Sequence, residues 1–268
     1  MQTHGRLGLE HTARNPVSAV ATSGELQGGK KMADFEMTPA STSPVTLAAA
    51  ERVTAFLRKV YGWMFAGLGV TAVVAFTVAG SPAMVQMIAS NHILFLGLVL
   101  GELGLVFYLS GRAPQLAPNV AVGLFVLYSA LNGVTLSLIL LMYTGASIAT
   151  TFAVTAGMFG ALALFGSTTK RSLAGAGQFF FMGLIGVVLA SVVGIFWHSA
   201  ALQFLISVVG VIVFTGLTAW DAQRLKQMAL TIPASQSGSY AIVGALSLYL
   251  NFLNLFLILL RFQGGSRD

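Results

Sequence analysis

The chain has 268 residues, of which 56% are hydrophobic and only 8% are charged, and its mean hydropathy is +0.84. Soluble domains usually contain about a quarter charged residues, so this composition excludes an ordinary soluble protein and predicts an integral membrane protein. The net charge of +6 does not indicate a nucleic-acid partner, because the basic residues stand singly or in pairs between apolar runs. The absence of Cys excludes thiol catalysis and disulfides.

The N-terminal part of the chain differs in composition from the rest. Residues 1–50 are rich in Gly, Ser, Thr and Pro with scattered charges, and they are predicted to form a disordered tail. This tail has no apolar segment typical of a secretory signal. Met32 and Met37 are alternative starts of the protein. A transmembrane bundle is expected over 51–263, followed by a short C-terminal tail at 264–268.

The apolar stretches after the tail are long and continuous, which indicates membrane-spanning helices and not the short alternating strands of a barrel. The sequence therefore predicts an all-α bundle of about seven transmembrane helices. We place these spans near 60–80, 92–111, 118–142, 147–166, 175–197, 200–223 and 239–262.

The basic residues predict the orientation of the bundle. Lys and Arg occur before the first span and in the second, fourth and sixth loops, whereas the first, third and fifth loops contain neither. Positive residues favour the cytoplasmic side, so we expect the N-terminus in the cytoplasm. The residues concerned are Arg52, Arg58, Lys59, Arg112, Lys170, Arg171, Arg224 and Lys226.

Two acidic residues lie within the membrane region, Glu102 in the middle of the second span and Asp221 near the end of the sixth. A carboxylate within a membrane is expensive and often marks an ion or proton route. The structural alternative for Glu102 is a neutral carboxyl group hydrogen-bonded to a neighbouring helix. The alternative for Asp221 is hydration at the helix end or an ion pair with Arg224 three residues on.

The last apolar run, from about Tyr240 to Phe262, is long enough to cross a bilayer. Its polar residues share one narrow stripe on a helix, because their spacing is i, i+4, i+7 and i+14. A helix surrounded by other helices can use such a stripe to line a cavity. The stripe consists of Ser247, Asn251, Asn254 and Arg261.

No motif indicates catalysis. The His residues stand alone, and no cluster has the spacing of a metal site or a serine nucleophile. We therefore expect no enzymatic activity and no resident cofactor. Ser129 and Asn132, in the third span, are expected to form hydrogen bonds between helices.

Two segments carry a resemblance to a known family. Residues 218–223 read Thr-Ala-Trp-Asp-Ala-Gln, and residues 244–256 read Gly-Ala-Leu-Ser-Leu-Tyr-Leu-Asn-Phe-Leu-Asn-Leu-Phe. Together with the first-helix segment 58–64 and Arg261-Phe262, they closely resemble the Bax inhibitor family (transmembrane Bax inhibitor motif proteins) of the bacterial type. The resemblance covers roughly residues 55–263.

The resemblance implies a seven-helix bundle whose last helix is wrapped by the other six, and a pH-sensitive calcium leak across the membrane. Asp221 matches the first Asp of a proton-sharing pair, which would also make it a calcium contact. Arg112 matches the Arg that latches the pair, and Glu102 with Arg261 matches a second acid–base couple. Calcium is then the transported ion, and the bacterial inner membrane is the expected location.

The sequence departs from the family pattern at Asn251, where the second Asp of the pair is expected. Two carboxylates in contact titrate together and can share one proton, which makes the pair a proton sensor. An Asp–Asn pair cannot share a proton in this way, although the amide can donate to an ionised Asp221. We therefore expect a blunted pH response and weaker calcium binding, because one anionic ligand is replaced by a carbonyl oxygen.

On this topology the polar residues form a broken line through the bundle, from Arg112 and Asp221 through Asn251 and Glu102 to Arg261. Such a line favours an intermittently open ion path, and a calcium leak channel is the leading hypothesis. The first alternative is a non-conducting regulator that binds other membrane proteins, such as a protease or a cell-death or stress factor. A transporter of a small solute is the weaker third option.

Overall fold

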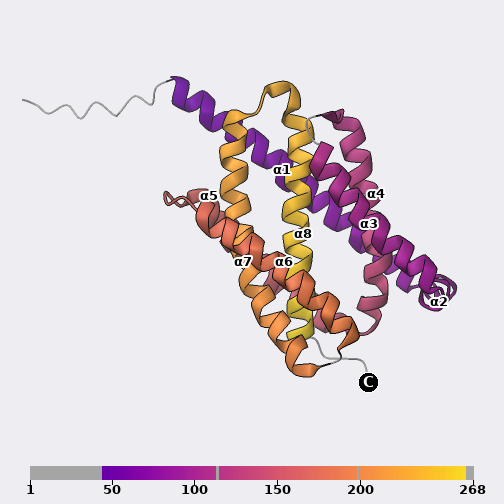
Figure 1. The fold of residues 1–268 in the computed structure, drawn as a ribbon. Coiled ribbons are helices and arrows are strands. Elements are labelled where there is room, and N and C mark those ends of the chain that lie inside the picture. Colours follow the sequence, from indigo (N-terminus) through magenta and orange to yellow (C-terminus); the bar gives the residue numbers. More distant parts are fainter. Residues whose placement is uncertain (1–43, 113–114, 198, 264–268) are drawn as a thin grey trace, which may run out of the picture. The chain divides into compact units, whose positions relative to one another are not determined.

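The computed structural model describes residues 44–112, 115–197 and 199–263, and these ranges are helical without any strand (Figure 1). Seven helices in the described ranges are long and apolar enough to cross a membrane. The predicted all-α membrane bundle is thereby confirmed. Most of the expected N-terminal tail, up to residue 43, and the C-terminal tail lie outside the described residues.

Several helices begin at the proline residues that interrupt the apolar runs of the sequence. Pro82 and Pro118 occupy the first turns of their helices, where a missing N–H group has no consequence. The nine-residue helix α2 was not predicted, because it is too short to register as a span. In chain order the helices are α1 Pro44–Ala79, α2 Pro82–Ser90, α3 His92–Arg112, α4 Pro118–Leu141, α5 Gly145–Thr168, α6 Ala174–Phe196, α7 Ala200–Thr231, the 3-10 helix η2 Ala234–Gln236 and α8 Ser237–Gln263.

Helices α1 and α7 extend beyond their predicted spans. α7 continues to Thr231, and α1 begins at Pro44, so the last residues assigned to the tail, 44–50, are helical. The α1 extension buries Phe56 on its apolar face, and Arg52 donates a 3.1 Å hydrogen bond to the carbonyl oxygen of Ile232 at the end of α7. The predicted boundaries were too short because hydropathy does not register an amphipathic extension that ends in charged residues.

Helix α8 lies at the centre of the bundle, as the resemblance implied. In its most apolar window 72% of the residues are buried inside the protein, against at most 33% for any other span of the described chain. Figure 1 shows α8, in yellow, running between the other helices. Four helices pack directly along it, namely α1, α4, α5 and α7.

The expectation that six helices wrap α8 needs a correction. Helix α6 packs on α7 and helix α3 packs mainly on α4, so both form an outer layer. Only a short part of α3 reaches α8. Helices α3 and α6 are the most lipid-exposed spans, with 6% and 11% of their apolar windows buried.

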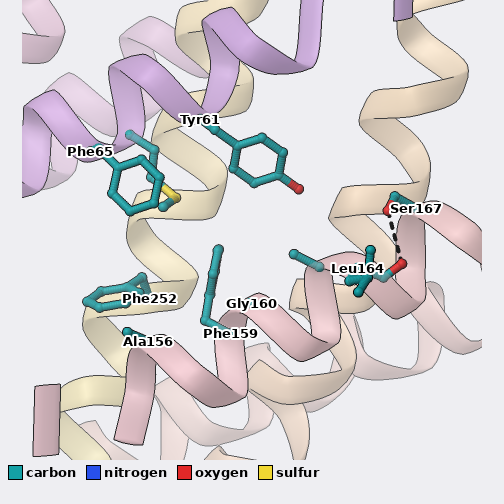
Figure 2. A pocket seen from close by; sticks show the side chains of 10 residues that line it. Tyr61, Phe65, Ala156, Phe159, Gly160, Leu164, Ser167 and Phe252 are labelled. Atoms are coloured by element: carbon teal, nitrogen blue, oxygen red, sulfur yellow. Dashed lines mark hydrogen bonds between the residues drawn. The ribbon is translucent and has the colours of Figure 1, made fainter. Parts of the chain in front are cut away.

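Helices α1 and α5 both flank α8 but scarcely touch one another in the described structure. A hollow lies between them, with Tyr61 and Phe65 on the α1 side and Gly160 on the α5 side (Figure 2). Phe252 of α8 lies at the bottom of this hollow. A seam thus runs between α1 and α5, two inner helices that are not in close contact in the described structure.

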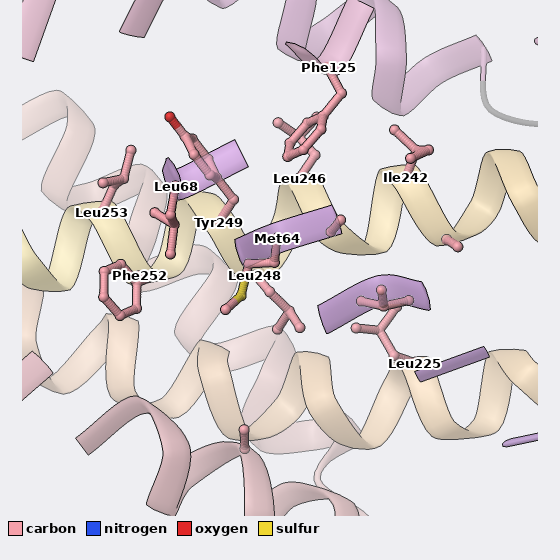
Figure 3. Close-up of a cluster of buried hydrophobic side chains, with 14 of the residues drawn as sticks. Met64, Leu68, Phe125, Leu225, Ile242, Leu246, Leu248, Tyr249, Phe252 and Leu253 are labelled. Atoms are coloured by element: carbon pink, nitrogen blue, oxygen red, sulfur yellow. The ribbon is translucent and has the colours of Figure 1, made fainter. Parts of the chain in front are cut away.

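The apolar core surrounds the middle of α8 (Figure 3). Met64 of α1, Phe125 of α4 and Leu225 of α7 belong to one buried cluster with Leu246 and Leu248 of α8, and Leu248 is fully buried. These side chains come from four different helices, so the core fixes how the helices are rotated about their own axes. This rotation decides which polar side chains meet.

Candidate functional site

Asp221 is buried because it shares the face of α7 that packs on the rest of the bundle. The neighbours on that face are Leu217, four residues before it, and Leu225, four residues after it, both of them buried. Only 5% of the Asp221 surface is exposed. The apolar spacing of α7 therefore carries the carboxylate into the interior.

The Asp221 carboxylate is held by donors from two helices. Ser247 Oγ and Asn251 Nδ2 of α8 both donate to Oδ2, at 2.6 and 2.8 Å. Arg224 Nη1 lies 3.7 Å from Oδ1 in an i, i+3 ion pair. The structure thus brings together three of the residues singled out in the sequence, Asp221, Ser247 and Asn251. All three partners of the carboxylate donate, which suits a group that accepts.

A pocket of about 280 Å³ opens beside Asp221. It is lined by Asp221, Arg224 and Ser247, together with Ser110 of α3 and Phe181 of α6. The side chain of Arg224 is half exposed and lies over the ring of Trp220, 5.3 Å from its centroid. The pocket therefore extends from the surface at Arg224 inward to the carboxylate.

Arg112 does not meet Asp221, although the end of α3 reaches the same pocket through Ser110. Its Nη1 donates to Gln115 Oε1 at 3.1 Å, and its side chain is exposed. The one ion pair formed within the described ranges is Asp221 with Arg224. A long cation at a helix end can remain hydrated, which explains why the predicted latch is absent from this conformation.

Glu102 belongs to a second polar network, between α3 and α4. Its Oε2 accepts from Asn132 Nδ2 at 3.2 Å, and its Oε1 accepts from Thr135 Oγ1 at 3.0 Å. The side chain is partly exposed and lines a pocket of about 320 Å³. The predicted role of Asn132 between helices is confirmed. Ser129 Oγ donates to Phe125 O within α4 at 2.9 Å, and the Ser129 side chain also forms a hydrogen bond with Tyr249 of α8.

The second network continues to a buried tyrosine that the sequence analysis did not single out. Asn132 Nδ2 lies 3.4 Å from Tyr128 OH, and the rings of Tyr128 and Tyr249 meet edge to face at 5.7 Å between centroids. Tyr249 OH and Thr71 Oγ1 are 2.6 Å apart. A fully buried Tyr in an apolar helix requires a partner for its hydroxyl group, and this was the available signal.

The C-terminal half of the α8 stripe, Asn254 and Arg261, does not join either network. Asn254 Nδ2 donates to Leu250 O of its own helix at 2.8 Å, and Arg261 is exposed. Arg261 forms no ion pair with Glu102 in the described structure. The expected couple is missing because Glu102 turns toward α4, where hydroxyl and amide donors are available.

The two networks contact different sides of α8. Ser247 and Asn251 bond Asp221 on one side, whereas Tyr249, two residues after Ser247 and so about 200° around the helix, faces Thr71. The two acidic residues of the broken polar line expected from the sequence are therefore divided between two networks on different sides of α8. Within the described ranges no group of three or more acidic, His or Cys residues could hold a metal ion.

Gln223 fixes α7 to the loop between α5 and α6. Its Nε2 donates to Arg171 O at 2.8 Å, and its Oε1 accepts from the backbone N–H group of Leu173 at 2.7 Å. In the sequence Gln223 stands out only as part of the motif 218–223. The available signal for this clamp was a polar residue two positions after Asp221, near the end of a long apolar run.

Two glycines allow the close helix contacts that hold the networks. A side-chain carbon at Gly166 of α5 would overlap the backbone of Ala219 in α7, two residues before Asp221. A carbon at Gly133 of α4 would lie 2.7 Å from Thr71 O of α1. Small residues commonly permit such approaches in membranes. Each acidic network therefore lies next to a pair of helices in close contact.

Comparison with known proteins agrees with this architecture. Residues 53–268 match the family model described as inhibitor of apoptosis-promoting Bax1. The inner membrane protein YbhL of Escherichia coli K12 is 50% identical over 215 residues, which are 79% of this chain and 92% of that protein. An uncharacterized protein of Borreliella burgdorferi is 44% identical over 80% of this chain and 93% of its own length. An uncharacterized membrane protein of Streptococcus pyogenes is 36% identical over 79% and 93%. The chain is an integral membrane protein and belongs to the Bax inhibitor family.

Proposed function

We propose that the protein is a calcium (cation) leak channel and that Asp221 is the anionic group that the ion meets inside the bundle. The observation that carries this proposal is the buried Asp221 carboxylate at the inner end of a pocket that reaches the surface. Ionisable groups within membrane bundles commonly serve ion or proton movement. Membership of the family, whose resemblance implied such a leak, supports the same role.

The ligands around Asp221 suit an ion that passes through. The carboxylate, the Ser247 hydroxyl group and, after rotation, the Asn251 amide oxygen are hard oxygen donors. Calcium takes about six to eight oxygen ligands, so this set supplies only part of the shell and water must supply the rest. Partial coordination of this kind gives weak binding, which a leak requires. Calcium is the transported ion in this proposal, and no enzymatic activity and no cofactor are proposed.

The pH response is proposed to be blunted at Asn251. The amide donates a 2.8 Å hydrogen bond to the Asp221 carboxylate, as a protonated second carboxyl group would. The amide cannot release that proton near neutral pH, so the pair has lost one of its two titrating members. Glu102, with its own pocket, is the second acidic group proposed to lie along the route.

The location proposed is the bacterial inner membrane, with the N-terminus in the cytoplasm. The location is supported by the name of the Escherichia coli relative, inner membrane protein YbhL. The orientation is supported by the alternation of basic residues between the loops.

A non-conducting regulator of other membrane proteins is the second candidate function. The observation that favours it is the separation of the Asp221 and Glu102 networks on different sides of α8. No chain of hydrogen bonds among the described residues joins the two acids through α8, so the bundle could act as a partner-binding scaffold.

Calcium flux into liposomes tests the proposal. Purified wild-type protein and Asn251→Asp are compared from mildly acidic to mildly alkaline pH. Asn254→Asp is the matched control, because Asn254 bonds its own helix and does not contact Asp221. We expect flux from all three proteins and a steep pH dependence only for Asn251→Asp.

Equal pH profiles for Asn251→Asp and wild type would overturn the assignment of Asn251. An absence of flux in every variant would favour the regulator, and crosslinking followed by co-purification would then identify its partners.

A further inference from the structure

The seam between α1 and α5 contains two hollows that share one floor residue. One, of about 330 Å³, extends from Tyr61 to Phe252, and the other, of about 410 Å³, extends from Phe252 toward Phe76. Both are lined almost entirely by apolar side chains. Together they form a groove along α1 from Tyr61 to Phe76, which is 15 residues or about 22 Å.

This groove is open on the side that faces the membrane. Phe65 and Leu164, which line it from α1 and α5, are 63% and 65% exposed. Gly160 leaves space in the wall, because a side-chain carbon there would meet no atom within 4 Å. One leaflet of a bilayer is about 15 Å of hydrocarbon deep, so the groove is long enough for a complete acyl chain.

One end of the groove is basic. Ser167 lines the groove, and Lys226 Nζ donates to Ser167 O at 2.8 Å. Arg58 precedes Tyr61 by three residues and Phe65 by seven, so it continues the groove face of α1 by one turn. Both cations are exposed, and neither forms an ion pair with an acidic residue that the structure describes. Their charge complements the phosphate group of a lipid.

We propose that the α1/α5 groove binds one acyl chain of an anionic phospholipid, with the lipid phosphate at Arg58 and Lys226. The apolar walls select hydrocarbon, because their hydration by water is unfavourable and the groove faces the membrane. The two cations select the anionic headgroup, because basic residues near the membrane surface attract anionic lipids. This binding site goes beyond the proposed channel function and does not rest on it.

Native mass spectrometry of the full chain in mild detergent tests the site. Delipidated protein is titrated with phosphatidylglycerol, the anionic probe, and with phosphatidylcholine as the zwitterionic comparison. We expect one phosphatidylglycerol bound per wild-type protein and at least about fivefold weaker binding of phosphatidylcholine.

The apolar wall of the groove is tested by substituting two glycines of α5. Gly160→Phe fills the groove, whereas Gly157→Phe adds the same side chain at a position that has the same open space but does not line either hollow. We expect Gly160→Phe to lose the bound lipid and Gly157→Phe to retain it. Equal lipid retention by these two folded variants would overturn the proposal.

The headgroup contact is tested with exposed cations, whose replacement leaves the core unchanged. The double variant Arg58→Gln/Lys226→Gln is compared with Lys59→Gln, which lies two residues from Tyr61 and therefore on another side of α1. We expect only the double variant to lose the preference for phosphatidylglycerol. An unchanged preference would overturn the headgroup assignment even if Gly160→Phe fails to fold.

Discussion

The Asp221 and Glu102 networks place the same functional group in two different settings. Asp221 is buried at the contact of α7 with the central helix and accepts hydrogen bonds from two side chains of α8. Glu102 lies on the outer helix α3, is partly exposed, and is held by donors from α4. The acid in the inner layer is therefore tied to α8 directly, and the acid in the outer layer only through intermediates.

Because of this difference, substitutions at Asp221 and at Glu102 are expected to have different consequences. A change at Asp221 alters the inner contact itself, so function and helix packing are both affected. A change at Glu102 alters a partly exposed side chain that lines its own pocket and is held by donors of α4. The expected effects below decrease from the inner layer to the outer one.

The largest effect is expected at the contact that positions Asp221. Gly166→Ala places a methyl group against the Ala219 backbone. Because backbone cannot move aside without separating α5 from α7, we expect a loss of about 3 kcal/mol in the free energy of unfolding. Unfolding by SDS titration measures it. Gly157→Ala, in open space, is the control and should be neutral or slightly stabilising; equal effects would contradict the close contact.

Removal of the inner charge should affect flux next. Asp221→Asn keeps the shape of the side chain and its place beside Ser247 and Asn251, but removes the anion. We expect calcium flux in liposomes to fall about tenfold or more, which corresponds to about 1.4 kcal/mol. Glu51→Gln, at an exposed position near the start of α1, removes one acidic group elsewhere and should leave flux unchanged. Full flux from Asp221→Asn would remove Asp221 from the route.

A smaller effect on stability is expected at Tyr249. Tyr249→Phe removes the buried hydroxyl group that contacts Thr71 at 2.6 Å and leaves the ring in place. We expect the free energy of unfolding to fall by about 1 kcal/mol, within the range for hydrogen bonds inside membrane proteins. Tyr108→Phe makes the same chemical change at an exposed site. If both variants unfold alike, the Thr71 contact contributes nothing.

The smallest effect is expected at the outer acid. Glu102→Gln keeps a carbonyl oxygen for Thr135 or Asn132 but removes the charge. Because Glu102 is partly exposed, we expect calcium flux to fall only about threefold, or about 0.6 kcal/mol. The measurement is the same liposome assay. A loss as large as that of Asp221→Asn would show that the outer acid controls passage as strongly as the inner one.

The spans were predictable from the sequence, because hydropathy alone separates lipid-facing helices from loops. The contact of Asp221 with Ser247 and Asn251 was also predictable, since the motifs 218–223 and 244–256 contain all three residues. The hydrogen-bond partners of Arg112 and Glu102 were not predictable from the sequence. Which donor a side chain selects depends on how each helix is rotated, and that rotation is decided by core side chains from several helices.

The clamp at Gln223 has a mechanical consequence. It joins α7 to the α5–α6 corner, and α5 and α6 both pack on α7, so we expect these three helices to move as one body. Helix α3 packs on α4 and α4 packs on α1, which forms a second body; α1 also contacts α7, where Arg52 bonds Ile232. Asp221 belongs to the first body and Glu102 to the second, and α8 lies between the two bodies. A turn of one body against the other would move Asp221 past Ser247 and Asn251 while Glu102 stays with its partners.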